Sequence, residues 1–352
     1  MIVQKNNRHN NESNNHPRLK SLYLMEHGTT LGKEQERFVI KYKGKVKQRI
    51  PAIHVDQILV YGNSQLTTQV MQYCLKQHIP IYLLSGNGQY YGMVDSFSTR
   101  SVLLHKEQFL RANDPDFCLS IAKQFIKGKI SNTRLILNRL SRHRKATAFE
   151  IAAQQLKWVI KQIDTASTLD QLRGFEGNAA RIHFQSIVTS VDAKWGFHGR
   201  VKRPATDPIN ALLSYGYSLL LRNIISLLKV RGLNSHIGYL HPIRRGHPAL
   251  ASDVIEEFRS IVVDTVVLNI ILNNKLSLED FKLPSKPGEA CYLTDPARRL
   301  FTQHIESKLN SQLTHPESLL KLDYRRCIEH QINHLASVIE QRGDNYKPLI
   351  LR

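Results

Sequence analysis

The period of the hydrophobic pattern changes once along the chain, and this change limits the folds that the chain can adopt. Up to about residue 100, short apolar runs alternate with turn signals such as Gly62-Asn63. The runs predict strands at residues 21–25, 37–42, 58–61, 79–84 and 90–94. One helix is expected among them, at 64–78, because Val70, Met71, Cys74 and Leu75 repeat at helical spacing.

Farther along, the apolar residues follow a helical period. One face of the first such helix carries Cys118, Ile121, Ala122, Phe125 and Ile126, whereas Lys123, Lys127 and Lys129 are expected largely on other faces. Asp207 followed by Pro208 predicts the start of a long apolar helix that ends near Lys229. Further helices are expected at 253–273 and from there to about residue 341.

These patterns predict an α+β fold with two domains. A polar tail with six Asn in its first fifteen positions covers residues 1–20 and is expected to be disordered. A small β-rich domain with one inserted helix follows at 21–100, and a linker at 101–112. The larger domain, at 113–345, is expected to be all α-helical, and residues 346–352 form a C-terminal tail.

The charge of the chain is its outlying compositional feature. Lys and Arg number 49 against 29 Asp and Glu, which gives a formal net charge of +20. Such an excess favours polyanionic partners, nucleic acid first and an anionic membrane second. The apolar run at 209–228 contains Asn210 and Arg222, so a buried helix is expected there and not a membrane span.

The cysteines, the N-terminal residues and the absence of certain motifs narrow the expected cellular compartment and the expected class of chemistry. The four cysteines contain no CxxC pair, which favours buried thiols in a reducing compartment. No signal peptide is expected, because the N-terminus has no apolar stretch, and we expect a cytoplasmic protein. No P-loop, HExxH, GxSxG or dinucleotide fingerprint occurs, so ATP and nicotinamide chemistry gain no support.

The first candidate for chemistry is Glu176, which lies in a helical pattern between Gly174 and Gly177. Each glycine costs about 1 kcal/mol relative to Ala inside a helix. Small residues beside a carboxylate permit a ligand to approach closely. They equally permit tight packing of another helix, and the local pattern does not decide between the two.

The second candidate is His241, which precedes Pro242. A residue before proline is pushed towards extended geometry, so His241 is expected on a loop. Its imidazole can bind a divalent metal or act as an acid–base group, although a lone histidine is more often structural. We expect Arg244 and Arg245, in the same loop, to contact phosphate, and His247 to be a weaker contact.

The third candidate is the acidic pair Asp253 and Glu256, three residues apart and thus on one helix face. Paired carboxylates suit a hard divalent ion. The pair also resembles a capping box, which needs no metal.

Several motifs together resemble those of the CRISPR-associated integrase-endonuclease family, the Cas-one proteins of spacer acquisition. The similar segments are 172–177 (LRGFEG), 203–208 (RPATDP), 238–241 (GYLH) and 253–259 (DVIEEFR), supported by 58–62 (ILVYG), 79–85 (IPIYLLS) and 346–348 (YKP). Their order and the spacing of His241 to the acidic helix match the family. The resemblance covers roughly residues 21–350.

The resemblance implies an activity and a site. Glu176, His241 and Glu256 would be catalytic residues and ligands of Mg²⁺ or Mn²⁺, with Asp253 assisting. The enzyme would be an endonuclease and integrase that joins the 3′-hydroxyl ends of short captured DNA, the protospacer, to the double-stranded repeat DNA of a CRISPR array, by transesterification. The family forms homodimers through its β domain and assembles with the small Cas-two protein.

We expect cationic and histidine side chains near these motifs to contact DNA. They are Arg173, Arg181, His183, Arg200, Lys202, Arg203, Arg244, Arg245, His247 and Arg259, and Arg298 and Arg299 are weaker candidates. His183 departs from the family, where an aromatic residue, commonly Tyr, is expected. His247 and Ala249 replace an expected Arg and Ser.

Two other interpretations compete with this one. A DNA-binding or scaffold protein without catalysis would use the same residues as caps and packing. An RNA-binding module is less favoured, because no interleaved aromatic stripe of the stacking type is present.

Overall fold

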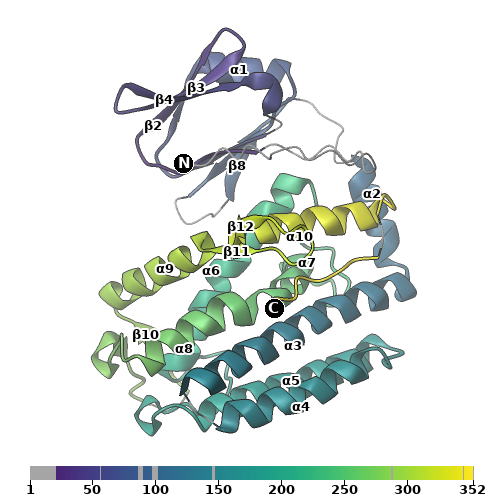
Figure 1. Cartoon of the computed structure of the whole chain (residues 1–352), viewed down its shortest axis with the longest axis vertical. Coiled ribbons are helices and arrows are strands. Elements are labelled where there is room, and N and C mark those ends of the chain that lie inside the picture. Colours follow the sequence, from purple (N-terminus) through teal and green to yellow (C-terminus); the bar gives the residue numbers. More distant parts are fainter. Residues whose placement is uncertain are drawn as a thin grey trace. The chain divides into compact units, whose positions relative to one another are not determined.

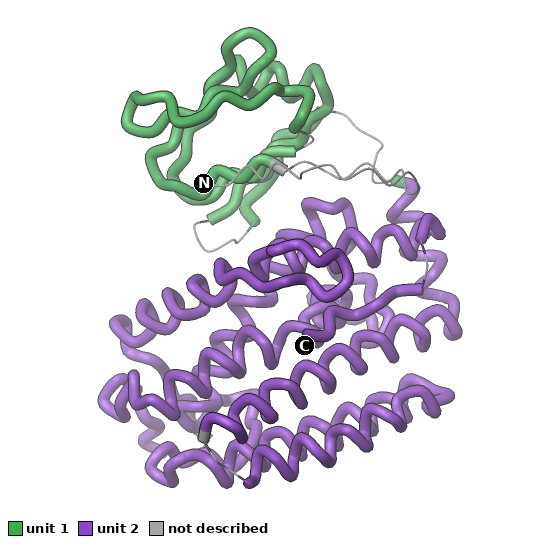
Figure 2. Tube along the Cα trace, in the orientation of Figure 1, with its two compact units in different colours: residues 1–102 green, residues 103–352 purple. Residues whose placement is uncertain are grey.

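The chain divides into two compact units, residues 1–102 and 103–352 (Figure 2). The computed structural model describes residues 21–55, 57–85, 90–96, 102–144, 147–286, 288–343 and 345–351. The predicted disordered tail at 1–20 lies outside these residues. The fold class is confirmed, with a β-rich first unit and a larger helical second unit (Figure 1).

The first unit contains two four-stranded sheets. Its elements are β1 (Ser21–Leu24), β2 (Thr29–Glu34), β3 (Arg37–Tyr42), β4 (Lys45–Pro51), η1 (Ala52–His54), β5 (Gln57–Tyr61), β6 (Gln65–Leu66), α1 (Thr68–Lys76), β7 (Ile81–Leu84) and β8 (Tyr90–Val94). One sheet has the order β1-β5-β7-β8 and the other β4-β3-β2-β6. All five predicted strands and the inserted helix are confirmed.

Three strands of this unit, β2, β4 and β6, were not predicted, and the composition of β4 explains why it was missed. β4 is an edge strand with the sequence KVKQRIP, and only Ile50 in it is buried. Charged side chains on an edge strand oppose pairing with other molecules and also remove the apolar alternation that would indicate a strand. β4 is held by its antiparallel register with β3, which is a tertiary feature.

The second unit is built from helices that run through residues 102–339. They are α2 (Val102–Ala112), α3 (Pro115–Arg144), α4 (Thr147–Ile163), α5 (Leu169–Val188), η2 (Ala193–Trp195), α6 (Pro208–Arg231), α7 (Ala249–Val254), η3 (Ile255–Glu257), η4 (Arg259–Asp264), α8 (Thr265–Leu272), η5 (Leu278–Asp280), α9 (Asp295–Asn310) and α10 (Tyr324–Ile339).

Two boundaries of the predicted domains need correction. The linker expected at 101–112 is largely the helix α2, whose Gln108 is buried and donates to the carbonyls of Asn234 and Ile237 at 2.8 and 2.9 Å. The expected C-terminal tail is instead packed, because Tyr346 and Leu349 are only 2% exposed.

The second unit is also not purely helical. Two short antiparallel pairs interrupt its C-terminal part, β9 (Phe281–Lys282) with β10 (Tyr292–Leu293) and β11 (Gln312–Thr314) with β12 (Lys321–Asp323). The region expected to be helical to about residue 341 therefore contains α9 and α10 with the β11–β12 pair between them.

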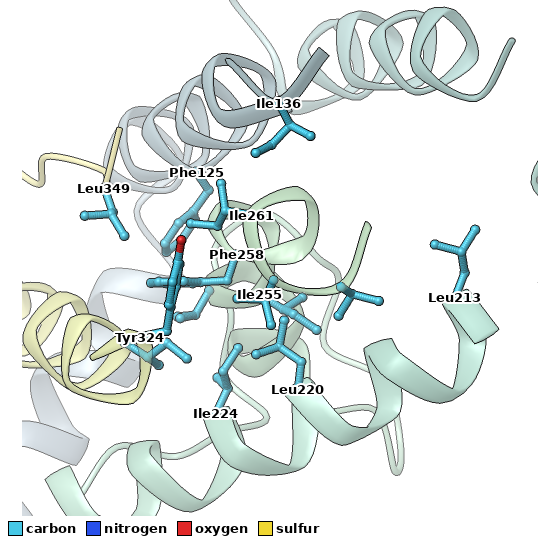
Figure 3. Close-up of a cluster of buried hydrophobic side chains, with 14 of the residues drawn as sticks. Phe125, Ile136, Leu213, Leu220, Ile224, Ile255, Phe258, Ile261, Tyr324 and Leu349 are labelled. Carbon is cyan, nitrogen blue, oxygen red and sulfur yellow. The ribbon is translucent and has the colours of Figure 1, made fainter. Parts of the chain in front are cut away.

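The core of the second unit forms around α6. Figure 3 shows Phe125 of α3, Leu220 of α6 and Tyr324 of α10 converging in one apolar cluster. Phe258, between η3 and η4, belongs to the same cluster. α6 is long and apolar enough to cross a membrane, yet 61% of its apolar window is buried inside the unit. It is capped by Asp207, whose carboxylate accepts from the Asn210 N–H at 2.9 Å, as the sequence predicts.

The acidic segment is an irregular helix and not the regular one expected at 253–273. It begins at Ala249, tightens to a 3₁₀ turn at Ile255–Glu257 and widens to a π-helix at Arg259–Asp264 before α8. Such changes of helical pitch are frequent at functional sites, because they re-aim side chains.

Candidate active site

Glu176 lies on α5, and its surroundings decide between the two interpretations of its glycine neighbours. α5 begins after Thr168, whose side chain accepts from the Gln171 N–H at 3.2 Å. A Cβ atom built on Gly174 or Gly177 would meet no atom within 4 Å. No helix among the described residues packs there, so the glycines leave open space beside a carboxylate that is 30% exposed.

Glu256 lies in the 3₁₀ turn η3 and is almost buried, with 5% of its side chain exposed. Burial would raise its pKa, but Arg259 and Lys129 lower the pKa to about 2. Oε1 lies 3.2 Å from Arg259 and Oε2 lies 2.7 Å from Lys129 Nζ. The Lys129 ammonium is thus the cationic partner of Oε2, by charge and by hydrogen bonding.

Lys129 of α3 joins the two glutamates. Its ammonium forms ion pairs with Glu176 and with Glu256. Burial lowers the pKa of Lys129, but the two carboxylates outweigh burial and the pKa is raised. Lys129 was expected off the apolar face of its helix, which is wrong: it follows the buried Phe125 by four residues and so faces inward. The four-residue spacing from Phe125 was the sequence signal that could have predicted this inward position.

His241 is held by Asp253. The loop placement of His241 is confirmed, and its Nδ1 lies 2.7 Å from Asp253 Oδ1. The same carboxylate, fully buried, accepts the backbone N–H groups of Tyr239, Leu240 and His241 at 2.6, 3.0 and 2.9 Å. Asp253 lies in the last turn of α7, not at a helix start, so the capping-box interpretation is wrong.

Gly238 makes this arrangement possible. A Cβ atom there would lie 2.6 Å from Asp253 Oδ2 and 2.8 Å from the backbone carbonyl carbon of Ala249. The loop before His241 therefore approaches the acidic helix more closely than any side chain would allow.

The three predicted ligands and Asp253 form two linked pairs and not one cluster. Glu176 and Glu256 converge on Lys129, and His241 pairs with Asp253 while lying near enough to Glu256 to lower its pKa. Among the described residues, no three acidic, histidine or cysteine side chains are grouped closely enough to hold a metal. The donor set nevertheless fits a cation, because two carboxylates already surround one.

Glu257, the neighbour of Glu256, serves a different purpose. Its buried carboxylate accepts from the Tyr346 hydroxyl at 2.5 Å and from the Leu349 N–H at 2.8 Å. Glu257 thus anchors the C-terminal segment, whereas Glu256 faces Lys129 and Arg259.

Some expected DNA contacts lie beside the acidic pairs. Arg259 pairs with Glu256. The pKa of Lys202 is lowered, chiefly by burial and then by the nearby positive charges of Arg259 and Lys129. Arg173 donates to the Leu240 carbonyl at 2.8 Å, so it supports the His241 loop. The rings of His241 and His247 lie 5.9 Å apart.

Other expected contacts are farther along the surface or engaged elsewhere. Arg200 donates to Asn210 Oδ1 at 2.8 Å and Ser214 Oγ at 3.0 Å, which ties it to the start of α6. Arg181 donates to Asn178 on its own helix. The side chains of Arg203, Arg244, Arg245, Arg298 and Arg299 are exposed.

His183 is not at the surface, which corrects its expected DNA contact. It is 4% exposed, and its Nε2 lies 3.0 Å from Asp264 Oδ2. Tyr217 donates to the other oxygen of Asp264 at 2.5 Å. His183 therefore belongs to a buried polar network between α5, α6 and the π-helical turn.

Comparison with known proteins identifies the family. The family described as CRISPR associated protein Cas1 matches residues 22–307. The CRISPR-associated endonuclease Cas1 3 of Thermus thermophilus is 31% identical over 333 residues, 94% of this chain and 97% of that protein. The endonuclease Cas1 1 of Moorella thermoacetica is 31% identical over 344 residues, 96% and 100% of the two chains.

Solved structures agree in fold. A CAS1 protein from Thermotoga maritima is 25% identical with a TM-score of 0.75 and covers 92% of this chain and 98% of its own. A casposase bound to integration product is 22% identical with a TM-score of 0.78, covering 94% and 99%. A chain of a partial Cas6-RT-Cas1–Cas2 complex is 23% identical with a TM-score of 0.80, covering 95% and 100%. With a family model matched over most of its length and near-full-length relatives above 30% identity, this chain belongs to the Cas1 family of CRISPR-associated proteins.

Proposed function

We propose that this protein is a metal-dependent DNA endonuclease and integrase that inserts protospacers into a CRISPR array by transesterification of 3′-hydroxyl ends onto repeat phosphodiesters. Its curated relatives are named endonucleases. Structures with the same fold include a casposase bound to integration product and a Cas1–DNA complex. The net charge of +20 favours a DNA substrate.

The observation that carries the proposal is the position of Lys129 between Glu176 and Glu256. Two carboxylates from separate helical segments converge on one cationic group, and Glu256 is almost fully buried there. Such a pair suits Mg²⁺ or Mn²⁺, which prefer carboxylate oxygens. We propose Glu176, Glu256 and His241 as the ligands.

When bound, the metal would neutralise charge on the phosphate and favour the ionised form of the attacking hydroxyl. The protein's own residues prepare this chemistry. Asp253 holds Nδ1 of His241, which fixes the ring and leaves Nε2 for a ligand. Arg259 and Lys202 supply positive charge beside the carboxylates, where the phosphate would lie.

The proposed partners follow from the family and the charge. We propose double-stranded DNA, both protospacer and repeat, a second copy of the chain bound through the β domain, and a Cas-two protein, since a structure of similar fold is part of a Cas1–Cas2 complex. We place the protein in the cytoplasm, where these DNA substrates are found.

Disintegration of a branched DNA substrate tests the proposal. The wild-type protein should resolve the branch in Mn²⁺ or Mg²⁺ and be inactive in EDTA. Glu176→Gln and His241→Ala should abolish the reaction while circular dichroism reports a folded protein. Glu279→Gln, which alters an exposed carboxylate, is the matched control and should remain active.

Each result separates the possibilities. Activity that persists in EDTA would exclude the metal, and activity that survives either active-site change would exclude the assigned residues. DNA binding without any strand transfer, under all metal conditions, would favour a scaffold.

A further inference from the structure

A surface hollow lies between α3 and α4, lined by Arg134 and Asn138 of α3 and by Lys157, Trp158 and Lys161 of α4, among others. Its volume is about 320 Å³. α3 and α4 run side by side (Figure 1), so the hollow is a groove along a helical hairpin. Nothing in the proposed chemistry uses it.

The hollow is cationic. Three of its lining side chains, Arg134, Lys157 and Lys161, carry positive charge, and no carboxylate lines it in the described part of the chain. None of the ion pairs found between described residues involves these three cations. Uncompensated positive charge in a concave surface attracts an anionic ligand.

Trp158 adds an aromatic surface to this charge. Its side chain is 68% exposed, and Lys161 Nζ lies 4.9 Å from its ring centroid. The other tryptophan, Trp195, is 2% exposed and packs in the core. Cations that follow a phosphate backbone, combined with an exposed aromatic ring on which a base can stack, are the features of single-stranded nucleic-acid sites.

The hollow faces away from the acidic pairs. Lys129 and Arg134 are five residues apart on α3, so their side chains point about 140° apart at 100° per residue. Lys129 binds Glu176 and Glu256, whereas Arg134 donates to the Ala153 carbonyl of α4 at 3.2 Å. The two sites therefore use different faces of the same helix.

We propose that the α3–α4 hollow binds a DNA strand with unpaired bases, with phosphates on Arg134, Lys157 and Lys161 and a base stacked on Trp158. An unpaired base is required, because the faces of paired bases are covered within a duplex. The proposal goes beyond strand joining and does not depend on the metal.

Intrinsic fluorescence tests the proposal directly. The full chain contains two tryptophans, and because Trp195 is buried, quenching by a ligand reports on Trp158. Titration with an oligothymidylate in EDTA should quench the wild-type emission. Trp158→Phe should remove the quenching, and Trp158→Ala should weaken oligonucleotide binding about threefold to tenfold, measured with a labelled oligonucleotide.

Charge variants supply the second arm. Lys157→Gln combined with Lys161→Gln should weaken oligonucleotide binding. The slope of log affinity against log salt concentration should become shallower by the equivalent of roughly one to two phosphate contacts. The control is Lys282→Gln combined with Lys286→Gln, which removes the same charge from another exposed segment. It should change the quenching and the affinity less than the Lys157→Gln, Lys161→Gln double variant does. Circular dichroism checks that each variant is folded.

Three outcomes would overturn the proposal. The first is a wild-type emission that the oligonucleotide does not change. The second is equal quenching by a blunt duplex of the same length, which would mean that unpaired bases are not selected. The third is equal quenching by polyglutamate, which would point to an acidic polypeptide as the occupant. Because the titration contains EDTA, a failure here is distinguishable from a failure of the proposed metal chemistry.

Discussion

The buried carboxylate of Asp253 contacts His241 at two atoms, the backbone nitrogen at 2.9 Å and the ring Nδ1 at 2.7 Å. One side chain thus fixes both the path of the loop and the orientation of the imidazole. The backbone N–H groups of Tyr239 and Leu240 also donate hydrogen bonds to Asp253, so this one carboxylate fixes three successive residues of the loop.

We expect Asp253→Asn to impair folding and activity together. The amide NH₂ cannot accept, so at least one buried N–H would lose its partner, at a cost of about 1–3 kcal/mol. Loss of the bond to the imidazole should slow strand joining about 10–100-fold. Urea unfolding and the disintegration rate measure the two effects. Asp116→Asn, at an exposed position, is the control, and wild-type rates in Asp253→Asn would contradict the positioning role.

Lys129→Met should make the protein more dependent on a divalent cation. Without the ammonium, the negative charges of Glu176 and Glu256 are less compensated, so the metal-free protein should melt at a lower temperature. Added Mn²⁺ should then raise Tm more than in the wild type, and Mn²⁺ should bind about tenfold more tightly, because it no longer competes with Lys129. Thermal melts across a Mn²⁺ series provide the measurement. An identical Mn²⁺ response in both proteins would show that the metal does not replace the Lys129 charge.

Alanine at the glycines should have opposite effects on stability. Gly238→Ala places a Cβ 2.6 Å from Asp253 Oδ2 and should destabilise by about 1–3 kcal/mol. Gly177→Ala meets no neighbour within 4 Å and should stabilise α5 by up to about 1 kcal/mol. If DNA uses the space beside Glu176, Gly177→Ala should still reduce strand joining. A Gly177→Ala protein that is more stable and equally active would mean that this space is not used.

Glu257 should make stability depend on pH. Burial raises its pKa to about 7 from 4.5, despite hydrogen bonds from Tyr346, Leu349 and Gln331. Because the folded-state pKa is the higher one, the contribution is complete below pH 4.5 and is lost as pH rises through 7. At about 1.4 kcal/mol per pKa unit, the loss is about 3 kcal/mol.

Glu257→Gln should remove this part of the dependence. Urea unfolding of the wild type and the variant at pH 5 and pH 7.5 compares the two slopes, with Glu279→Gln as the control for an exposed carboxylate. Parallel slopes in the wild type and Glu257→Gln would mean that Glu257 ionises in the folded protein as freely as in the unfolded one.

The sequence by itself determined the elements whose signals are local. The strand β3 and the helix α6 follow from apolar periodicity and from the Asp207-Pro208 start, because these patterns act within a few residues. The placement of His241 on a loop follows in the same way from the proline after it. The motifs lead to Glu176, His241 and Glu256 as proposed site residues, and the net positive charge by itself indicates a nucleic-acid partner.

Only the tertiary structure decided the contacts between distant segments. Lys129 lies 47 residues from Glu176 in sequence, and no local pattern indicates that they meet. The glycines beside Glu176 permit two interpretations from sequence alone, and the structure distinguishes them because no neighbour packs there within its described residues. From sequence alone, Asp253 can be interpreted as a helix cap, because Asp and Glu three residues apart fit a capping box as well as the paired carboxylates of a metal site. Its actual role depends on the loop that Gly238 allows to lie against it, and such close approach is a property of packing that local sequence cannot specify.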